Sequence, residues 1–366
     1  LENGVGSCFA GKCYALFCVL ASLGMGCMVQ AGALADSLRY AASLPPLGTG
    51  IILAVLTAVV LFGGAKRIGW TASVLVPVSA GLYLLAGGIA VFSFYDQIPE
   101  ILGNIVGGAF GLADNAGQTD GSSILNFSGI SGGMTGYGMA AAIRSGVSRG
   151  VFSNEAGLGS SVMVHSSSNV KEPVAQGMWG IFEVFADTIV VCTLTALVIL
   201  TTGVVELESG AVLAGVQDNA LVGQAFTAAF GSFGPKFIAV SILLFAYSTT
   251  LGWSHYGTKA VEYLFGTAGS RIYKVVFVCM TVVGATMKLG LAWDLSDTFN
   301  GLMMIPNLIG VLALSGTVVD ITRNYFARRV RGEDIEPMWS AFEEYQKEEE
   351  AEAAAEKAEL EKAANK

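Results

Sequence analysis

Hydrophobic residues make up 53% of the 366 positions and charged residues only 13%, a balance outside that of ordinary soluble domains. The formal net charge is −9 at pH 7 with only two histidines, His165 and His255, so a histidine-based metal or nucleophile site is not expected. The composition predicts an all-α, polytopic membrane protein whose partner is a lipid bilayer and not a nucleic acid.

Seven apolar stretches are long enough to cross a bilayer, which takes about 20 residues. They lie at about 14–37, 48–64, 72–95, 176–202, 236–256, 271–289 and 295–320. Hydropathy alone would leave the Gly-, Ala- and Ser-rich segment between Tyr95 and Glu172 outside the membrane.

The distribution of Lys and Arg adds an eighth span. Cytoplasmic flanks carry the excess of basic residues, so the arginines that follow the last stretch place the C-terminus in the cytoplasm: Arg323, Arg328, Arg329 and Arg331. Counting backwards, the Lys66–Arg67 loop is cytoplasmic only if about 131–166 also crosses. Its glycines and polar residues predict a discontinuous helix whose unwound backbone lines a cavity.

The two ends of the chain lead to two separate expectations. It begins with Leu1, and nothing before Lys12 resembles a signal peptide, so we expect the natural N-terminus to be missing. The tail is rich in Glu, Lys and Ala, which is typical of a solvated arm. We expect a transmembrane domain over 1–325 and a charged cytoplasmic tail over 326–366.

The segment 150–161 is the most informative stretch. It places polar side chains and glycines at mid-membrane. A break there would expose backbone amides that suit a carboxylate and carbonyls that suit a cation. A polar cytoplasmic loop is the alternative interpretation.

Five ordered motifs carry a resemblance to a known family. They are Gly24-Met-Gly-Cys-Met-Val-Gln-Ala31, Phe62-Gly-Gly-Ala-Lys-Arg-Ile68, Ala142-Ile-Arg-Ser-Gly-Val-Ser-Arg-Gly-Val-Phe-Ser-Asn-Glu-Ala-Gly-Leu-Gly-Ser160, Val184-Phe-Ala-Asp-Thr-Ile-Val-Val-Cys-Thr193 and Ser248-Thr-Thr-Leu-Gly-Trp-Ser254. Together they cover about 14–325, and the chain resembles the alanine or glycine:cation symporters, also called sodium:alanine symporters.

The resemblance implies a LeuT-type fold of two inverted five-helix repeats with a site at mid-membrane. On that plan, the eight spans correspond to core helices three to ten, and core helices one and two are missing. It also implies a substrate site made by Gly26, Gln30, Phe152, Ser153, Asn154, Gly157, Thr249 and Trp253. For Gly26 and Gln30, which lie four apart on one helix face, a helix contact and an interhelical hydrogen bond are the alternative.

A sodium site is expected on the 236–256 span. Ala246, Thr249 and Thr250 have the spacing at which LeuT-type carriers offer one carbonyl and two hydroxyls to sodium, and oxygen ligands suit a hard cation. Hydroxyls that bond back to the preceding turn are the alternative.

Ionisable residues inside the membrane need partners. Glu183 and Asp187 lie four apart within the 176–202 span, and the candidate partners are Arg144 and Arg149. A structural or gating network is favoured over ligand contact.

We therefore expect a non-enzymatic, multi-pass protein of the plasma (inner) membrane. It would import alanine or glycine with sodium as the coupling ion, by alternating access and without a cofactor. The alternatives are a membrane channel, which needs a continuous polar pore, and an intramembrane serine hydrolase. The latter would use Ser131, in Gly129-Ile-Ser-Gly-Gly133, with His165 or His255, a weak motif in glycine-rich sequence.

Overall fold

A computed structural model describes residues 1–110, 134–205, 218–340 and 342–351. Within these ranges the regular secondary structure is helical, as the sequence predicted. The helices are α1 (Glu2–Val5), α2 (Cys8–Leu23), η1 (Gly24–Val29), α3 (Gln30–Ala42), α4 (Pro46–Leu61), α5 (Ala65–Ser93), η2 (Tyr95–Gln97), α6 (Ile98–Phe110), α7 (Met134–Asn154), α8 (Val162–His165), α9 (Pro173–Val184), η3 (Phe185–Val191), α10 (Cys192–Thr201), α11 (Asp218–Phe230), η4 (Gly231–Phe233), α12 (Gly234–Thr286), α13 (Leu289–Ala313) and α14 (Ser315–Arg329).

Local signals set several helix boundaries. The Ser7 hydroxyl accepts a hydrogen bond from the Ala10 amide at 3.3 Å and caps α2. Pro46 begins α4, where its missing N–H costs no helical hydrogen bond. Gly64 precedes α5 with a φ of 85°, which a side chain would disfavour. The second apolar stretch therefore becomes a helix of its own, separate from the first and the third.

The long apolar helices match the membrane class. Among the described residues, four helices are long and apolar enough to cross a bilayer: Cys8–Ala42, Ala65–Ser93, Pro173–Thr201 and Leu221–Thr286. A fifth results if Leu289–Ala313 and Ser315–Arg329, bent by 54°, form one span. The chain is thus a multi-pass membrane protein.

Some spans differ in detail from the predicted ones. The expected stretch 48–64 is the 16-residue helix α4, shorter than the other spanning helices. The expected stretches 236–256 and 271–289 both lie in α12, which is interrupted at Gly266, where φ is 72°. Helix α14 ends at Arg329, and the division into a transmembrane domain and a tail at 325 stays a prediction.

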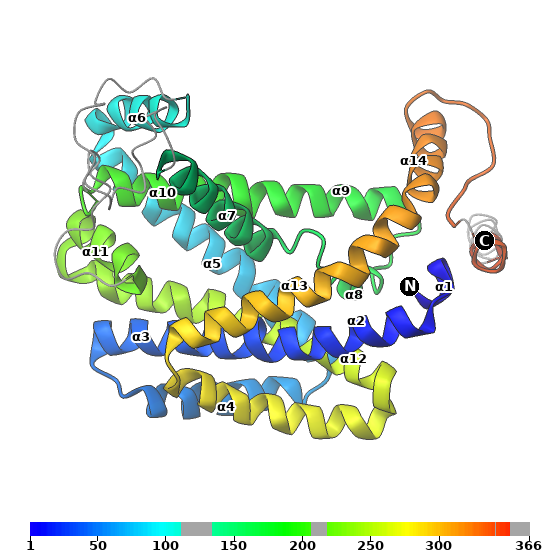
Figure 1. Ribbon diagram of the computed structural model, residues 1–366, viewed down its shortest axis with the longest axis horizontal. Coiled ribbons are helices and arrows are strands. Elements are labelled where there is room, and N and C mark those ends of the chain that lie inside the picture. The colour runs from blue at the N-terminus through cyan, green and yellow to red at the C-terminus, as the bar shows by residue number, and fades with distance from the viewer. Residues whose placement is uncertain (111–133, 206–217, 341, 352–366) are drawn as a thin grey trace, which may run out of the picture.

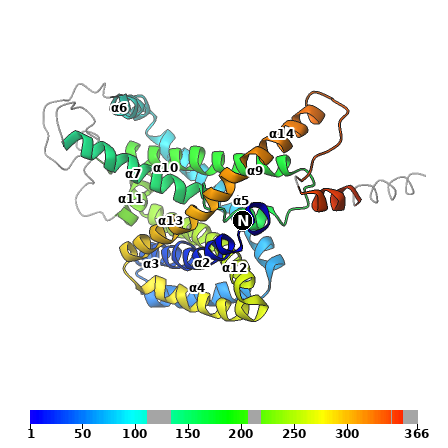
Figure 2. The same ribbon diagram turned by 45° about the vertical axis from the view of Figure 1, so that its right-hand side comes forward.

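The rod formed by α2, η1 and α3 runs through the centre of the molecule (Figure 1). Helix α12 packs along this rod and against α4, and α13 packs against α2 and η1. At one crossing, a Cβ added to Gly284 would lie 2.5 Å from the Met28 Cα atom, so only glycine permits this approach of the two backbones. Figure 2 shows α4 on one side of the rod and α9 and α10 on the other.

The helix is interrupted near the predicted break, whereas the described part of the segment 131–166 is not among the helices long and apolar enough to cross a bilayer, and its membrane crossing stays a prediction. Helix α7 ends at Asn154, the chain is non-helical over 155–161, and α8 is a single turn. The break lies within a few residues of the predicted 152–159. The helix that follows the break, α8, is short, because positive φ angles at Gly157 and Gly159 and a run of serines interrupt the helix.

Candidate substrate and cation site

Gly26 and Trp253, two of the predicted site residues, are packed against each other. A Cβ added to Gly26 would lie 2.1 Å from the Trp253 Cβ atom. Gly26 is buried in η1, and the Trp253 side chain is 1% exposed in α12. The indole packs edge-on against Tyr256, with ring centroids 5.3 Å apart. Two residues 227 positions apart, 253 minus 26, thus pack against each other, and their role in a substrate site stays a prediction.

Phe152 reaches the same region from the last turn of α7. It packs against the hydrophobic cluster that contains Met25, Leu158 and Trp253. Its ring centroid also lies 4.7 Å from that of Trp293 on α13. Phe152 therefore connects the break to α13 and to the Gly26–Trp253 contact.

Ser153, Asn154 and Gly157 are directed to different partners. The Ser153 hydroxyl donates to the Asp187 carboxylate in η3. The Asn154 side-chain oxygen accepts from the Ala156 amide at 2.9 Å, which ends α7. The Gly157 carbonyl accepts from the Asn307 side-chain amide of α13 at 2.9 Å. These three residues stabilise the break, and they do not converge on one point.

Gln30 and the expected sodium ligands lie on the helices that flank the Gly26–Trp253 contact. The Gln30 amide donates to the Met25 carbonyl at 3.3 Å, within its own helix. Thr249 is half-buried and Ala246 buried. The Thr250 hydroxyl donates to the Ala246 carbonyl at 2.8 Å, the bond to the preceding turn that the sequence left open as an alternative. The hydroxyl oxygen keeps lone pairs that can accept a cation.

Arg149, one of the two predicted partners of Glu183 and Asp187, forms an ion pair with a different residue. Arg149 pairs with Asp297 on α13, and its guanidinium lies 4.5 Å from the Trp293 ring centroid. Asp187 accepts from Ser153. Glu183 lies 3.4 Å from His165. The last turns of α7 contact α13, which brings Arg149 within reach of Asp297 and Trp293.

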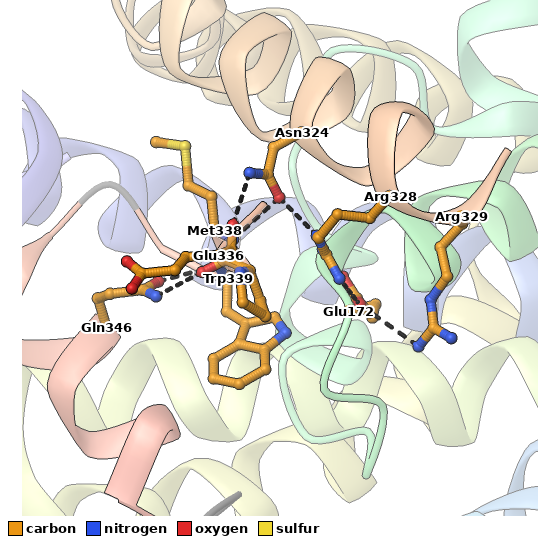
Figure 3. A network of polar contacts seen from close by, with 9 residues as sticks. Glu172, Asn324, Arg328, Arg329, Glu336, Met338, Trp339 and Gln346 are labelled. Carbon is orange, nitrogen blue, oxygen red and sulfur yellow. Dashed lines mark hydrogen bonds and ion pairs between the residues drawn. The ribbon is translucent and has the colours of Figure 1, made fainter. Parts of the chain in front are cut away.

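A second polar network joins α14 to the segment before α9 (Figure 3). Arg328 donates two hydrogen bonds of 2.9 Å to the Glu172 carboxylate, and each of the two side chains is 12% exposed. Hydrogen bonds from Arg328 hold the pKa of the Glu172 carboxyl below its usual value. Asn324 accepts from Arg328 at 2.8 Å and from the Met338 amide at 3.0 Å. The chain after α14 is thereby fixed to the helical domain.

Two cavities flank the break. One of about 450 Å³ is lined by α2, the break, α12 and α13, and includes Tyr14, Ser166 and Asn307. The other, of about 420 Å³, lies between α7 and α13 and includes Phe152 and Asn300. Neither includes Gly26 or Trp253, which are packed against each other.

Sequence reasoning missed the polar residues of α13. Asn300 donates to the Met25 sulfur at 3.1 Å, and its side-chain oxygen is buried with no partner among the described residues. Asn307 holds the break through Gly157. Asparagines within an apolar span were the available signal, because buried amides need hydrogen-bond partners. The serine hydrolase alternative rested on Ser131, which lies outside the described residues.

Comparison of the amino-acid sequence with known proteins identifies one family. The model of the sodium:alanine symporter family matches residues 1–338. The sodium/alanine symporter AgcS of Methanococcus maripaludis is 39% identical over 324 residues, which cover 88% of this chain and 66% of AgcS. The probable sodium/glutamine symporter GlnT of Bacillus subtilis is 33% identical, over 91% of this chain and 65% of GlnT. The sodium/proton-dependent alanine carrier protein of Bacillus sp. strain PS3 is 32% identical, over 84% of this chain and 68% of that protein. The chain thus spans about two thirds of the length of these relatives.

Proposed function

The chain belongs to the sodium:alanine symporter family, and we propose that it forms the main part of a secondary active symporter. The protein would import a small neutral amino acid, alanine or glycine, together with sodium by alternating access. The observation that carries the proposal is the juxtaposition of the broken span 155–161 with the Gly26–Trp253 contact. Unwound backbone beside an aromatic side chain offers both polar groups and an apolar wall.

The packing around Trp253 supports a small substrate. The indole lies directly on the backbone of Gly26, and Phe152 closes the same cluster from α7. Any substrate side chain placed at this contact would have to displace one of these rings, which favours a small side chain. Substrate contacts are proposed for Gly26, Gln30, Phe152, Ser153, Asn154, Gly157, Thr249 and Trp253.

The coupling ion is proposed to be sodium, bound on α12. Thr249 and Thr250 lie three and four residues after Ala246, one turn further along α12, and Thr250 lies fully buried. Oxygen atoms are the ligands that suit a hard monovalent cation, and this face supplies a carbonyl and two hydroxyls. The names of the relatives include both sodium and proton as coupling ions, so the assignment to sodium calls for direct measurement.

The wider arrangement is also part of the proposal. We infer that the helices form two inverted repeats of the LeuT type. We also infer that the chain spans the plasma membrane with its C-terminus in the cytoplasm. The basic residues that follow α13 support this orientation. The π-helical segments η1 and η3 support a functional role for α2–α3 and α9–α10, because such bulges occur frequently at functional sites.

Calorimetry on the full-length protein tests the proposal. Alanine affinity should rise with sodium concentration, and sodium affinity should rise with alanine by the same factor, because the two binding free energies are linked. Potassium replaces sodium as the control. Glycine should compete with alanine, and glutamine should compete weakly. Equal alanine affinity in sodium and potassium would refute sodium coupling, and preferential glutamine binding would refute the substrate assignment.

A further inference from the structure

The chain after α14 turns back onto the helical domain (Figure 1). Gly332, shortly after the end of α14, has a φ of 71°, a conformation that favours glycine. The residues that follow it, 333–340 and 342–350, form the C-terminal segment. Asn324 of α14 fixes the first part of this segment, because its side-chain oxygen accepts from the Met338 amide at 3.0 Å. The segment is thereby held beside the helix that it follows.

Gln346 joins the second part of the C-terminal segment to the first (Figure 3). Its side-chain oxygen accepts from the Trp339 and Ser340 amides at 2.9 and 3.0 Å, and its side-chain nitrogen donates to the Pro337 carbonyl at 2.7 Å. Like the bond to Asn324, these are hydrogen bonds between uncharged groups, each of which contributes little to stability. Most side chains of the segment are exposed, and exposed parts with few buried apolar contacts open most readily. The segment can therefore detach while the helices stay folded.

The cavity of about 450 Å³ adjoins one element that α14 holds in place. This element is the segment 166–172 between α8 and α9, which begins with Ser166 in the cavity lining. It ends with Glu172, which accepts two hydrogen bonds of 2.9 Å from Arg328 of α14. Arg328 also donates to Asn324 at 2.8 Å. A continuous series of hydrogen bonds thus leads from this part of the cavity wall to the C-terminal segment.

Helix α1 is a second element of the same cavity wall. Leu1 and Glu2 line the cavity, and the Glu2 carboxylate accepts from the Tyr263 hydroxyl of α12. The next residue, Asn3, donates from its side-chain amide to the Tyr345 hydroxyl of the C-terminal segment at 3.5 Å. The C-terminal segment and the end of α14 therefore connect two elements that line one cavity.

These connections restrain a cavity that reaches the break between α7 and α8. Gly159 of the break and Asn307 of α13 also line it. Under the proposed orientation, the cavity lies on the cytoplasmic side, because the C-terminal segment contacts its lining elements. A carrier opens and closes such cavities by moving helices and loops relative to one another. A segment that links two parts of the wall opposes that movement.

We propose that the C-terminal segment is an autoinhibitory clasp on the cytoplasmic cavity. While the segment is attached, it links the wall at Glu172 to the wall at Asn3 and slows the movement that releases alanine. When the hydrogen bonds of Asn324 and Gln346 break, the two parts of the wall move independently and transport is faster. This inference rests on the proposed transport function and adds a control of its rate.

Spin-label distances show whether the segment is attached, without any transport. The labels are placed on Ser168→Cys, before α9, and on Glu348→Cys, in the C-terminal segment, both at exposed positions. The full-length protein used has its native cysteines replaced by alanine. This background should give one narrow distance distribution, and Asn324→Ala combined with Gln346→Ala should give a broad one. A broad distribution in the background, or a narrow one in the combined variant, would overturn the proposal.

Alanine uptake into proteoliposomes measures the effect of the clasp on transport. Gln346→Ala should raise the initial uptake rate by about fivefold, the factor that corresponds to one hydrogen bond, and should leave the alanine affinity in calorimetry unchanged. Tyr345→Phe removes only the hydroxyl that Asn3 contacts and should also raise the rate. Glu344→Ala is the matched control, because Glu344 is exposed beside these two residues, and it should behave like the wild type.

The failure of the clasp and the failure of the proposed function give different results. Uptake rates in Gln346→Ala and Tyr345→Phe that equal or fall below the wild-type rate would overturn the clasp and leave the proposed function intact. A wild type that takes up no alanine would refute the proposed function and the clasp with it. If Gln346→Ala does not fold, Gln346→Glu, which keeps the accepting oxygen and loses the donor, should still give a smaller increase in rate.

Discussion

Gly26→Ala is expected to damage the substrate site through a steric effect. The new Cβ would lie 2.1 Å from the Trp253 Cβ and 2.5 Å from its Cγ. Carbon atoms in van der Waals contact lie about 3.5–4.0 Å apart, so η1 and α12 must separate by about 1.5 Å. Both atoms belong to the rigid base of the side chain. No rotamer of Trp253 relieves the Cβ contact.

The expected magnitude follows from packing. Overpacking a well-packed core costs about 1–3 kcal/mol, and replacing glycine inside a helix returns about 0.5–1 kcal/mol. The net loss of stability is thus about 0–2.5 kcal/mol. If substrate binding requires the same close contact, the alanine affinity falls by about tenfold, since 1.4 kcal/mol corresponds to that factor.

Thermal unfolding in detergent and alanine calorimetry measure both effects. Gly252→Ala is the control, because a Cβ at Gly252 meets nothing within 4 Å, and it should be neutral or slightly stabilising. Trp253→Ala should not rescue Gly26→Ala, since alanine keeps the clashing Cβ, whereas Trp253→Gly should rescue part of the unfolding temperature. If Gly26→Ala matches Gly252→Ala in both measurements, the close contact is not present in the protein.

Three further predictions concern other parts of the structure. Trp253→Ala should weaken alanine uptake without preventing membrane insertion, because it enlarges the site; unchanged affinity would remove Trp253 from it. Thr250→Ala should raise the sodium concentration for half-maximal uptake, and Thr250→Ser should have a mild effect; sodium titrations that match the wild type for both would place the ion elsewhere. Arg328→Gln should cost about 2–3 kcal/mol, between the values for exposed and buried pairs. Because the pKa of Glu172 is lowered on folding, the pair stabilises the protein above the ordinary glutamate pKa of about 4.3. That stability should disappear as pH falls through the lowered pKa, and an Arg328→Gln unfolding profile with the same acid dependence as the wild type would contradict this origin.

The all-helical fold class and the position of the break in the chain could be predicted from the sequence. Long apolar stretches predict spanning helices because every backbone group in a bilayer needs an internal partner. The glycines at 157 and 159 and the polar residues beside them predicted the interruption that the structure has over 155–161. The length of the following helix could not be read in the same way, because serines tolerate both helical and turn conformations.

Long-range pairings were beyond sequence reasoning. Arg149 and Asp297 are 148 residues apart, and Glu172 and Arg328 are 156 apart. Charge type alone allowed Arg149 to pair with Glu183 or Asp187 equally well, and only the path of α7 beside α13 decided the partner. The Gly26–Trp253 contact was anticipated only through the family resemblance, since neither residue type specifies the other.

Concentrative uptake tests the central claim most directly. Full-length protein in proteoliposomes, given an inward sodium gradient, should accumulate labelled alanine above its external concentration. Collapsing the sodium gradient should release the accumulated alanine, and an equal potassium gradient should drive none. Equilibration of alanine without accumulation would identify a channel, and accumulation that ignores the sodium gradient would contradict sodium-coupled symport.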